Sequence, residues 1–244
     1  MRTIYKTRES QVAIRGVEEE LFQRVLHADA CLSDLDDTDA ASPAKSIALH
    51  NWRSRLWNDF GYLCWFVETG WHYLFNGNNA ESERWRKYVD LFIKNKGGNT
   101  EALAQIDRLI DTSHITASLF PGVAEFYDLL PAKKYYVSRN IPLIVQKYGQ
   151  HLGFRDTFGE VYDKAQFVEG FVREHVNFQH YAVRGDSKED KEVLDILQSC
   201  VRSLRIKSVV GIFVAGNRTN PGFEIETSRN QTGLVELLKS HQAK

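Results

Sequence analysis

Cysteine is scarce in this chain of 244 residues, which contains three: Cys31, Cys64 and Cys200. An odd number of cysteines at wide spacing fits neither a disulfide framework nor a zinc site built from paired cysteines. Two of the three lie in apolar segments, so we expect buried free thiols in a reducing, cytoplasmic compartment. A glycine-rich phosphate-binding loop is also missing.

Net charge and long apolar runs are lacking as well. The formal charge is −1 at pH 7, which argues against binding to nucleic acid and against a polybasic contact with membranes. The most apolar stretch, residues 60–75, is interrupted by Glu68 and His72 and is too short for a membrane span. The first residues carry basic side chains without an apolar core behind them, unlike a secretory signal. We therefore expect a protein with no nucleic-acid and no membrane partner.

Short apolar runs alternate with helical patterns over much of the chain. Strands are expected at 30–32, 135–137, 181–183, 209–214 and 223–225, and helices at 16–27, 122–130, 141–148 and 190–204. This alternation predicts an α/β fold with a Rossmann-like parallel sheet covered by helices on both faces. Right-handed crossovers then bring the carboxyl ends of the strands to one edge.

Residues 43–113 have a different character. Their patterns are helical, and this segment holds all five tryptophans, which are Trp52, Trp57, Trp65, Trp71 and Trp85. We predict a helical cap domain at 43–113, inserted into an α/β core made of 29–42 and 114–244. Residues 1–28 then form an N-terminal extension with one helix.

An acidic run, Asp34-Leu35-Asp36-Asp37-Thr38, directly follows the first strand of this core. Ligands of α/β sheets bind at the carboxyl ends of strands. The spacing of Asp34 and Asp36 lets one carboxylate attack while the other transfers protons. Taken alone, the run is more typical of an Asx turn or a helix N-cap.

The same sheet edge is expected to collect Ser138, Lys164 and Asp186 beside Asp34 and Asp36. Carboxylates held this close repel one another unless a cation compensates them. Hard oxygen ligands favour Mg²⁺, which also accepts phosphate oxygens. A lysine and a hydroxyl group facing the same point suit a phosphoryl group.

These motifs resemble the haloacid dehalogenase superfamily, specifically its phosphatases with a helical C1 cap. The family pattern Asp-x-Asp-x-Thr is matched by 34–38, its hydroxyl-ended strand by 135–138, its lysine by Lys164 and its Gly-Asp-Ser-x-x-Asp motif by 185–190. The resemblance covers about residues 29 to 240. Ser33 stands where the family usually has an apolar residue, Asp37 stands where glycine is more frequent, and no proline follows Lys164.

The resemblance implies a Mg²⁺-dependent phosphatase that acts through an aspartyl phosphate. Asp34 would be the nucleophile and a metal ligand. Asp36 would be the general acid/base and would offer its backbone carbonyl to the metal. Because members that cleave carbon–halogen bonds lack this second aspartate, Asp36 argues for phosphoryl transfer.

The remaining motif residues are assigned by the same resemblance. Ser138 and Lys164 would hold the phosphoryl group, with Arg139 and Asn140 as further candidates. Asp186 would complete the metal site, and Asp190 would support it or orient Lys164. The sequence Ser187-x-x-Asp190 before an apolar helix face is also a capping box, a role compatible with the first.

A cap of this kind implies a small phosphorylated substrate, because a lid excludes water and supplies specificity. A phosphomutase and a phosphonate hydrolase of the same superfamily stay open as alternatives. From another class, a non-catalytic binding or regulatory protein would keep the fold without the chemistry. A homodimer formed through the aromatic insert is a further expectation.

Overall fold

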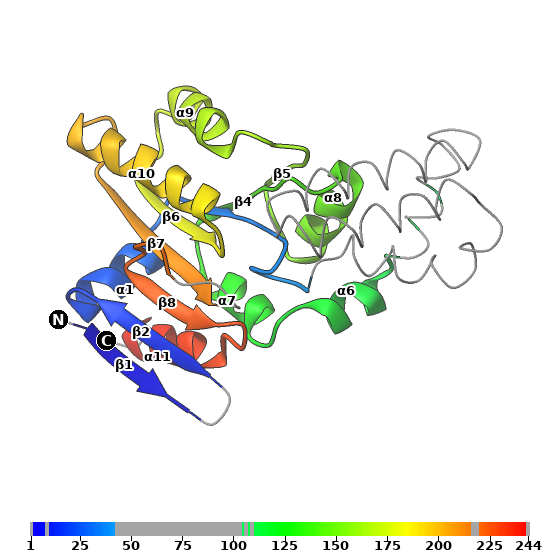
Figure 1. The fold of residues 1–244 in the computed structure, drawn as a ribbon, viewed down its shortest axis with the longest axis horizontal. Coiled ribbons are helices and arrows are strands. Elements are labelled where there is room, and N and C mark those ends of the chain that lie inside the picture. The colour runs from blue at the N-terminus through cyan, green and yellow to red at the C-terminus, as the bar shows by residue number, and fades with distance from the viewer. Residues whose placement is uncertain are drawn as a thin grey trace, which may run out of the picture. The chain divides into compact units, whose positions relative to one another are not determined.

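Eight strands form one sheet in the order β1-β2-β8-β7-β6-β3-β4-β5 (Figure 1). The strands are β1 (Arg2–Lys6), β2 (Gln11–Arg15), β3 (Ala30–Ser33), β4 (Lys133–Val137), β5 (Asp156–Phe158), β6 (His180–Gly185), β7 (Ser208–Ala215) and β8 (Ile225–Ser228). Every pairing from β8 across to β5 is parallel, whereas β2 pairs with β8, and β1 with β2, in the antiparallel sense. The predicted α/β fold with a mostly parallel sheet is confirmed, and β1, β2 and β5 are strands that the sequence patterns did not predict.

The computed structural model describes residues 2–7, 10–41, 104, 107, 110–215 and 220–242. The chain divides into two compact units, one made of Met1–Ala41 with Thr116–Lys244 and the other of Ser42–Ile115. The sheet belongs to the first unit. Nearly all of the predicted cap at 43–113, including the five tryptophans and Cys64, lies outside the described residues, so the cap domain stays a prediction.

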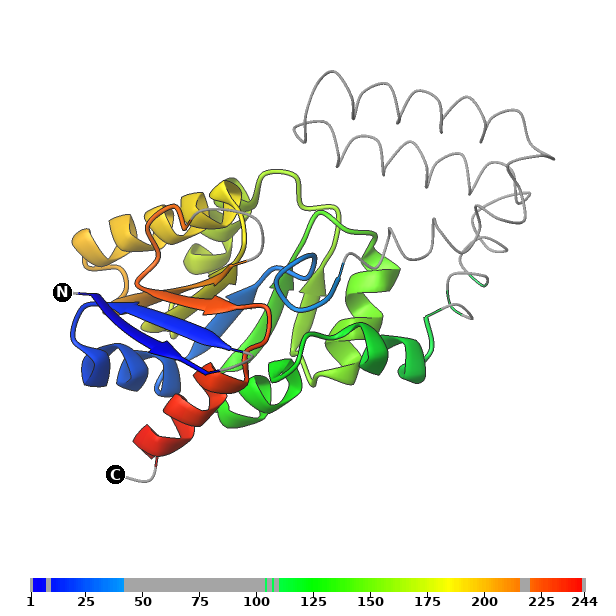
Figure 2. The same cartoon turned by 60° about the horizontal axis from the view of Figure 1, so that its bottom comes forward.

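Seven described helices accompany the sheet: α1 (Glu18–Leu26), α6 (Thr112–Ser118), α7 (Val123–Leu129), α8 (Pro142–His151), α9 (Lys164–Glu174), α10 (Lys188–Arg202) and α11 (Thr232–Gln242). Helices α9 and α10 cover one face of the sheet, and α1, α7 and α11 cover the other (Figure 2). Helices on both faces were predicted, although α9 and α11 themselves were not. No helix within the described ranges is long and apolar enough to cross a membrane.

The apolar face of α10 anchors one side of the core. Val193, Leu194, Leu197 and Cys200 recur at helical spacing and are buried against side chains of α9 and of the sheet. Burial of each such side chain contributes about 1.5–3 kcal/mol. Since α10 begins at Lys188, directly after β6, this packing also fixes the position of the helix N-terminus at the end of that strand.

The order of the strands in the sheet reverses at β3. This strand has β4 on one side and β6 on the other. Ser33, the last residue of β3, pairs with Tyr136 of β4 and with Arg184 of β6. The residues that follow these strands therefore meet at the same edge. This reversal of strand order is the place where open α/β sheets bind their ligands.

The contact between α7 and α11 allows a first prediction. Gly122, at the start of α7, has a φ of 85°, and a Cβ atom there would lie 2.7 Å from the backbone nitrogen of Thr232. Gly153 has a φ of 68° but open space around it. We expect Gly153→Ala to cost about 1–2 kcal/mol through the left-handed backbone alone. Gly122→Ala should cost about 1–3 kcal/mol more through overpacking, measured as free energies of unfolding in urea. Equal losses for the two variants would contradict the close contact.

Candidate active site

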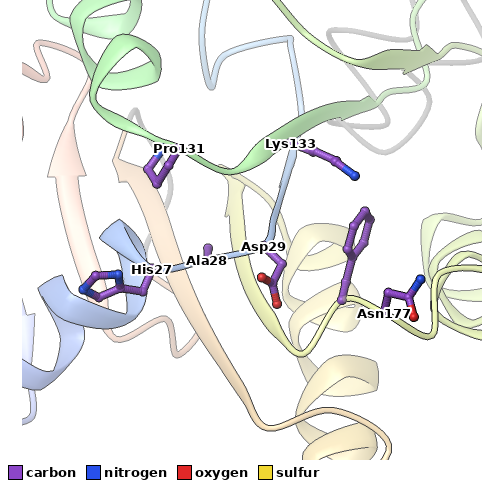
Figure 3. A pocket seen from close by; sticks show the side chains of 7 residues that line it. His27, Ala28, Asp29, Pro131, Lys133 and Asn177 are labelled. Atoms are coloured by element: carbon purple, nitrogen blue, oxygen red, sulfur yellow. The ribbon is translucent and has the colours of Figure 1, made fainter.

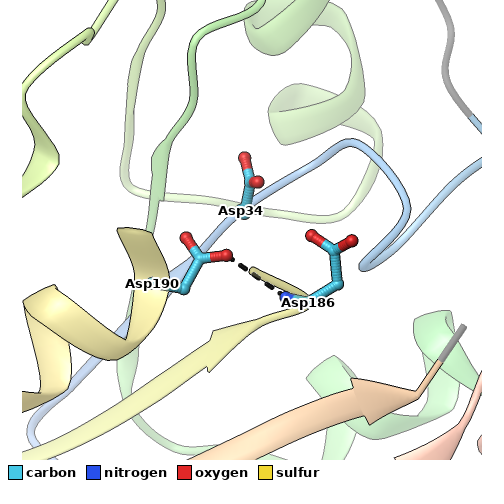
Figure 4. A group of neighbouring side chains, drawn as sticks. All are labelled: Asp34, Asp186 and Asp190. Atoms are coloured by element: carbon cyan, nitrogen blue, oxygen red, sulfur yellow. Dashed lines mark hydrogen bonds between the residues drawn. The ribbon is translucent and has the colours of Figure 1, made fainter. Parts of the chain in front are cut away.

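Three carboxylates meet where β3 and β6 end (Figure 4). Asp34 follows β3, Asp186 follows β6, and Asp190 lies in the first turn of α10. One oxygen atom from each of the three lies within 4.8 Å of the others, an arrangement that could hold a metal ion. Like charges at this distance repel, so the cluster requires a compensating cation.

Lys164 supplies a positive charge to this cluster. Its Nζ atom lies 2.9 Å from Oδ2 of Asp34 and 2.7 Å from Oδ1 of Asp190, and only 4% of its side chain is exposed. Burial alone would lower the pKa of Lys164, but Asp190 and Asp34 together raise it above its ordinary value. For Asp34, burial raises the pKa, and the ammonium of Lys164 opposes that shift. Lys164 therefore stays charged between the two carboxylates.

Lys164 lies at the start of a helix. It is the first residue of α9, whose N-cap is Asp163, with the Asp163 side chain accepting a hydrogen bond from the backbone of Gln166. An N-cap and a lysine at the first helical position aim the long side chain back toward the sheet edge. The lysine is thus oriented by a helix terminus and not by a loop.

The capping box predicted at Ser187 and Asp190 is confirmed. Oδ2 of Asp190 accepts hydrogen bonds from the backbone nitrogens of Asp186 and Ser187, at 3.2 and 3.1 Å, and from the Ser187 hydroxyl at 2.5 Å. A Cβ atom at Gly185 would lie 2.2 Å from Asp190, so only glycine fits there. Both oxygens of Asp190 are therefore engaged, one by Lys164 and one by the cap.

Asn140 contacts Asp36. Its Nδ2 atom lies 3.1 and 2.9 Å from the two carboxylate oxygens of Asp36, and its own Oδ1 accepts a hydrogen bond from the backbone of Ile141. We expected Asn140 as a candidate phosphate ligand. In the structure its amide contacts the Asp36 carboxylate, and the phosphate-binding role stays a prediction.

Ser138 and Arg139 follow β4 at the same edge. Ser138 is fully buried, and its backbone is tied to Phe158 and Val161 by hydrogen bonds of 2.9 and 3.0 Å. Its hydroxyl oxygen accepts from the backbone nitrogen of Asn140 at 3.3 Å. Nη2 of Arg139 lies 3.1 Å from Oε1 of Glu189, and both side chains are about one-third exposed. Arg139 thus stands at the solvent side of the site.

Asp37 and Ser33, which depart from the pattern that the sequence resembles, both make contacts in or next to the acidic loop (residues 34–40). Asp37 adopts a positive φ of 57°, and its carboxylate pairs with Arg229 at 2.5 Å. Aspartate tolerates this backbone conformation better than most residues. The Ser33 hydroxyl oxygen lies 2.8 Å from the hydroxyl oxygen of Tyr127 and 3.0 Å from the carbonyl oxygen of Asp34. Both side chains help to hold the loop in place.

A separate hollow of about 490 Å³ lies at the opposite edge of the sheet, between the amino ends of β3 and β4 (Figure 3). It is lined by His27, Ala28, Asp29, Pro131, Lys133, Asn177 and Phe178. Oδ2 of Asp29 accepts backbone hydrogen bonds from Gln179 and His180, so this carboxylate serves the fold. We assign no chemistry to this hollow.

No protein-family model and no curated protein matches the sequence. Solved structures do match. A Burkholderia xenovorans LB400 protein described as a haloacid dehalogenase-like hydrolase is 15% identical, with a TM-score of 0.50, over 88% of this chain and 99% of that chain. A Bacillus subtilis protein described as a HAD-hydrolase bound to magnesium is 14% identical, with a TM-score of 0.48, over 87% and 99%. A substrate-bound phosphoserine phosphatase is 13% identical, with a TM-score of 0.47, over 76% and 86%.

At these identities the likeness concerns the fold. The chain has the haloacid dehalogenase-like fold, and this part of our prediction is confirmed. The roles of individual residues depend on the geometry described above and on experiments.

The position of Lys164 predicts a strong effect on stability. Lys164→Met removes the cation between Asp34 and Asp190 and leaves their charges uncompensated. We expect a loss of about 3–5 kcal/mol in the free energy of unfolding at pH 7 without divalent cations, measured in urea. The exposed Lys188, at the start of α10, offers a matched control, and Lys188→Met should change stability by no more than about 0.5 kcal/mol. Equal stabilities of the two variants would contradict the ion pairs.

Proposed function

We propose that this chain is a Mg²⁺-dependent phosphatase that hydrolyses a small phosphorylated metabolite through an aspartyl phosphate. The observation that carries the proposal is the cluster at the carboxyl ends of β3 and β6. In it, Lys164 bridges Asp34 and Asp190, and Asp186 lies within reach of the same ion. The haloacid dehalogenase-like fold supports a hydrolase at this position.

The donor set suits Mg²⁺. Carboxylate oxygens of Asp34 and Asp186 are hard ligands, and Mg²⁺ usually takes only one or two carboxylates while keeping sites for water and phosphate. Asp190 has both oxygens engaged by Lys164 and by the cap, so it would support the site rather than bind the ion. The Asp36 carbonyl stays a predicted third ligand. When bound, Mg²⁺ would offset the negative charge of the carboxylates and of the phosphoryl group.

The chemistry follows from two aspartates with different surroundings. A carboxylate oxygen of Asp34 attacks phosphorus, the bond from phosphorus to the leaving oxygen breaks, and Asp36 gives that oxygen its proton. In the second step Asp36 takes a proton from water, whose oxygen attacks phosphorus and releases inorganic phosphate from Asp34. Asn140 keeps the Asp36 carboxylate in place for both transfers.

The phosphoryl group would be held by Lys164 and by the hydroxyl of Ser138. Arg139 is a candidate for a second anionic group of the substrate, because it stands at the solvent side and already pairs with a carboxylate. Buried free thiols at Cys31 and Cys200 are consistent with a reducing cytoplasm. Burial raises the pKa of Cys31 to about 12, so this thiol takes no part in the chemistry.

A phosphomutase or phosphonate hydrolase would need additional groups from the insert, outside the described residues. Hydrolysis needs only groups found at this sheet edge, and we prefer it for that reason. A non-catalytic binding protein is the alternative from a different class. The first variant below separates it from an enzyme.

Asp34→Asn is the direct test of the nucleophile. The native chain should hydrolyse an aryl phosphate in a Mg²⁺-dependent way, and the variant should lose at least about 10³-fold in kcat because an amide does not attack phosphorus. Asp128→Asn, at an exposed position of α7, is a matched control and should keep the native kcat. If the native chain shows no metal-dependent activity on an aryl phosphate or on a panel of metabolite phosphates, the proposal fails.

Asp36→Asn tests the division of labour between the two aspartates. An aryl leaving group departs without protonation, so phosphorylation of Asp34 should still occur. Hydrolysis of the phosphoenzyme should slow by about 10²–10⁴-fold, because no base activates the water. The covalent phosphoenzyme should then accumulate and be visible by intact-mass measurement after a short incubation. Unchanged turnover in this variant would exclude Asp36 as the proton-transfer residue.

A further inference from the structure

A second set of charged groups includes one residue of the acidic loop (residues 34–40). The proposed chemistry does not use this set. Arg184 of β6 and Asp39 of the loop have fully buried side chains, and Nη1 of Arg184 lies 2.7 Å from Oδ1 of Asp39. The hydroxyl groups of Tyr127 and Tyr136 donate to Oδ2 of Asp39 at 2.6 and 2.7 Å. Burial alone would lower the pKa of Arg184, but Asp39 raises it, so the guanidinium stays charged.

This pair is tied to the backbone of the loop that carries Asp34 and Asp36. Nη2 of Arg184 donates to the side chain of Gln231 at 2.6 Å, and Gln231 in turn donates to the carbonyl of Thr38 at 3.0 Å. Within the loop, the backbone nitrogens of Asp39 and Ala40 both donate to the carbonyl of Leu35. Contacts with Arg184 and Gln231 therefore attach the loop to the rest of the protein. The hydrogen bonds to the Leu35 carbonyl stabilise the conformation of the loop itself.

The guanidinium of Arg184 is also enclosed by aromatic rings. Its Cζ atom lies 4.3 Å from the ring centroid of Phe126 and 4.8 Å from that of Tyr127. These contacts leave the group little freedom to move. Since Arg184 stands two positions before Asp186, the same side chain links the strand end that carries Asp186 to the loop that carries Asp34.

Stability alone does not explain a charged pair at this place. A buried ion pair costs desolvation energy, and apolar side chains of similar volume are often as stabilising or better. What a charged, hydrogen-bonded pair adds is direction, because each bond restricts the angle as well as the distance between its groups. The loop is the element that such directional bonds restrict here.

We propose that Asp39 and Arg184 are positioning residues, whose buried ion pair sets the loop 34–40 so that Asp34 and Asp36 face the reacting phosphorus. The inference rests on the proposed function and extends it to two residues that touch no substrate. A displacement of a reacting group by about 1 Å can cost about 10²-fold in rate. The pair therefore acts on kcat through the geometry of the loop.

The double variant Asp39→Leu/Arg184→Met tests this role. It replaces the pair by apolar side chains, whereas Arg184→Met alone would leave Asp39 buried and unpaired and could fail to fold. We expect the double variant to fold but to unfold at a lower urea concentration than the native chain, because the buried hydroxyl groups of Tyr127 and Tyr136 lose their acceptor. Its kcat on an aryl phosphate should fall by about 10²-fold, with KM changed by less than about threefold. A folded double variant with native kcat would overturn the inference.

Hydrogen exchange gives a second measurement that needs no activity. The amides of Asp39 and Ala40 should exchange at least about tenfold faster in the double variant, while amides of β7 keep their native rates. Tyr181→Phe is a matched control on β6, because the buried Tyr181 hydroxyl has no partner among the described residues, and it should change neither kcat nor loop exchange. Unchanged loop exchange in the double variant would contradict the proposal. If the native chain is inactive, the proposed function is refuted. The hydrogen-exchange rates of the loop amides then decide separately whether the pair orders the loop.

Discussion

The rest of the site depends on one interaction, the bridge that Lys164 makes between Asp34 and Asp190. Three carboxylates with oxygens within 4.8 Å of one another would otherwise repel strongly. The parallel sheet brings Asp34 and Asp186 to one edge, and α10 adds Asp190, but packing alone does not compensate their charge. The lysine at the start of α9 does so. A substrate phosphate and a divalent cation would enter a site whose charges are already partly balanced.

Asp34 and Asp36, the two aspartates of the proposed chemistry, have different surroundings. Asp34 is paired with an ammonium group, whereas Asp36 faces the amide of Asn140. A nucleophile must be ionised, and a general acid/base must change its protonation state during the reaction. The amide of Asn140 is neutral, whereas the ammonium group of Lys164 carries a positive charge. These different surroundings support the two different roles that we propose for Asp34 and Asp36.

Local sequence patterns were enough to predict the parallel core and the groups at its edge. The strands at β3, β4, β6 and β7 are short apolar runs, and the motif residues follow them directly. The antiparallel strands β1 and β2 were missed because five-residue segments carry little periodicity, and β1 alternates only between exposed and half-buried positions. Pairs such as Asn140 with Asp36 depend on strand register, which no local pattern encodes. The cap, the homodimer and the cytoplasmic location stay predictions.

Arg184 is visible in the sequence as an unusual residue for a buried strand, but the sequence does not show its partner. A charged residue directly after the apolar run 181–183 and before Gly185 is unusual for a buried strand, because a buried charge must be paired. The partner, Asp39, is part of the acidic loop and looks there like one more surface carboxylate. Only the pairing of β3 with β6 shows that the two meet with both side chains fully buried. Since such a pair is hard to justify by stability, its position between the two strand ends that carry Asp34 and Asp186 supports the positioning role that we propose for it.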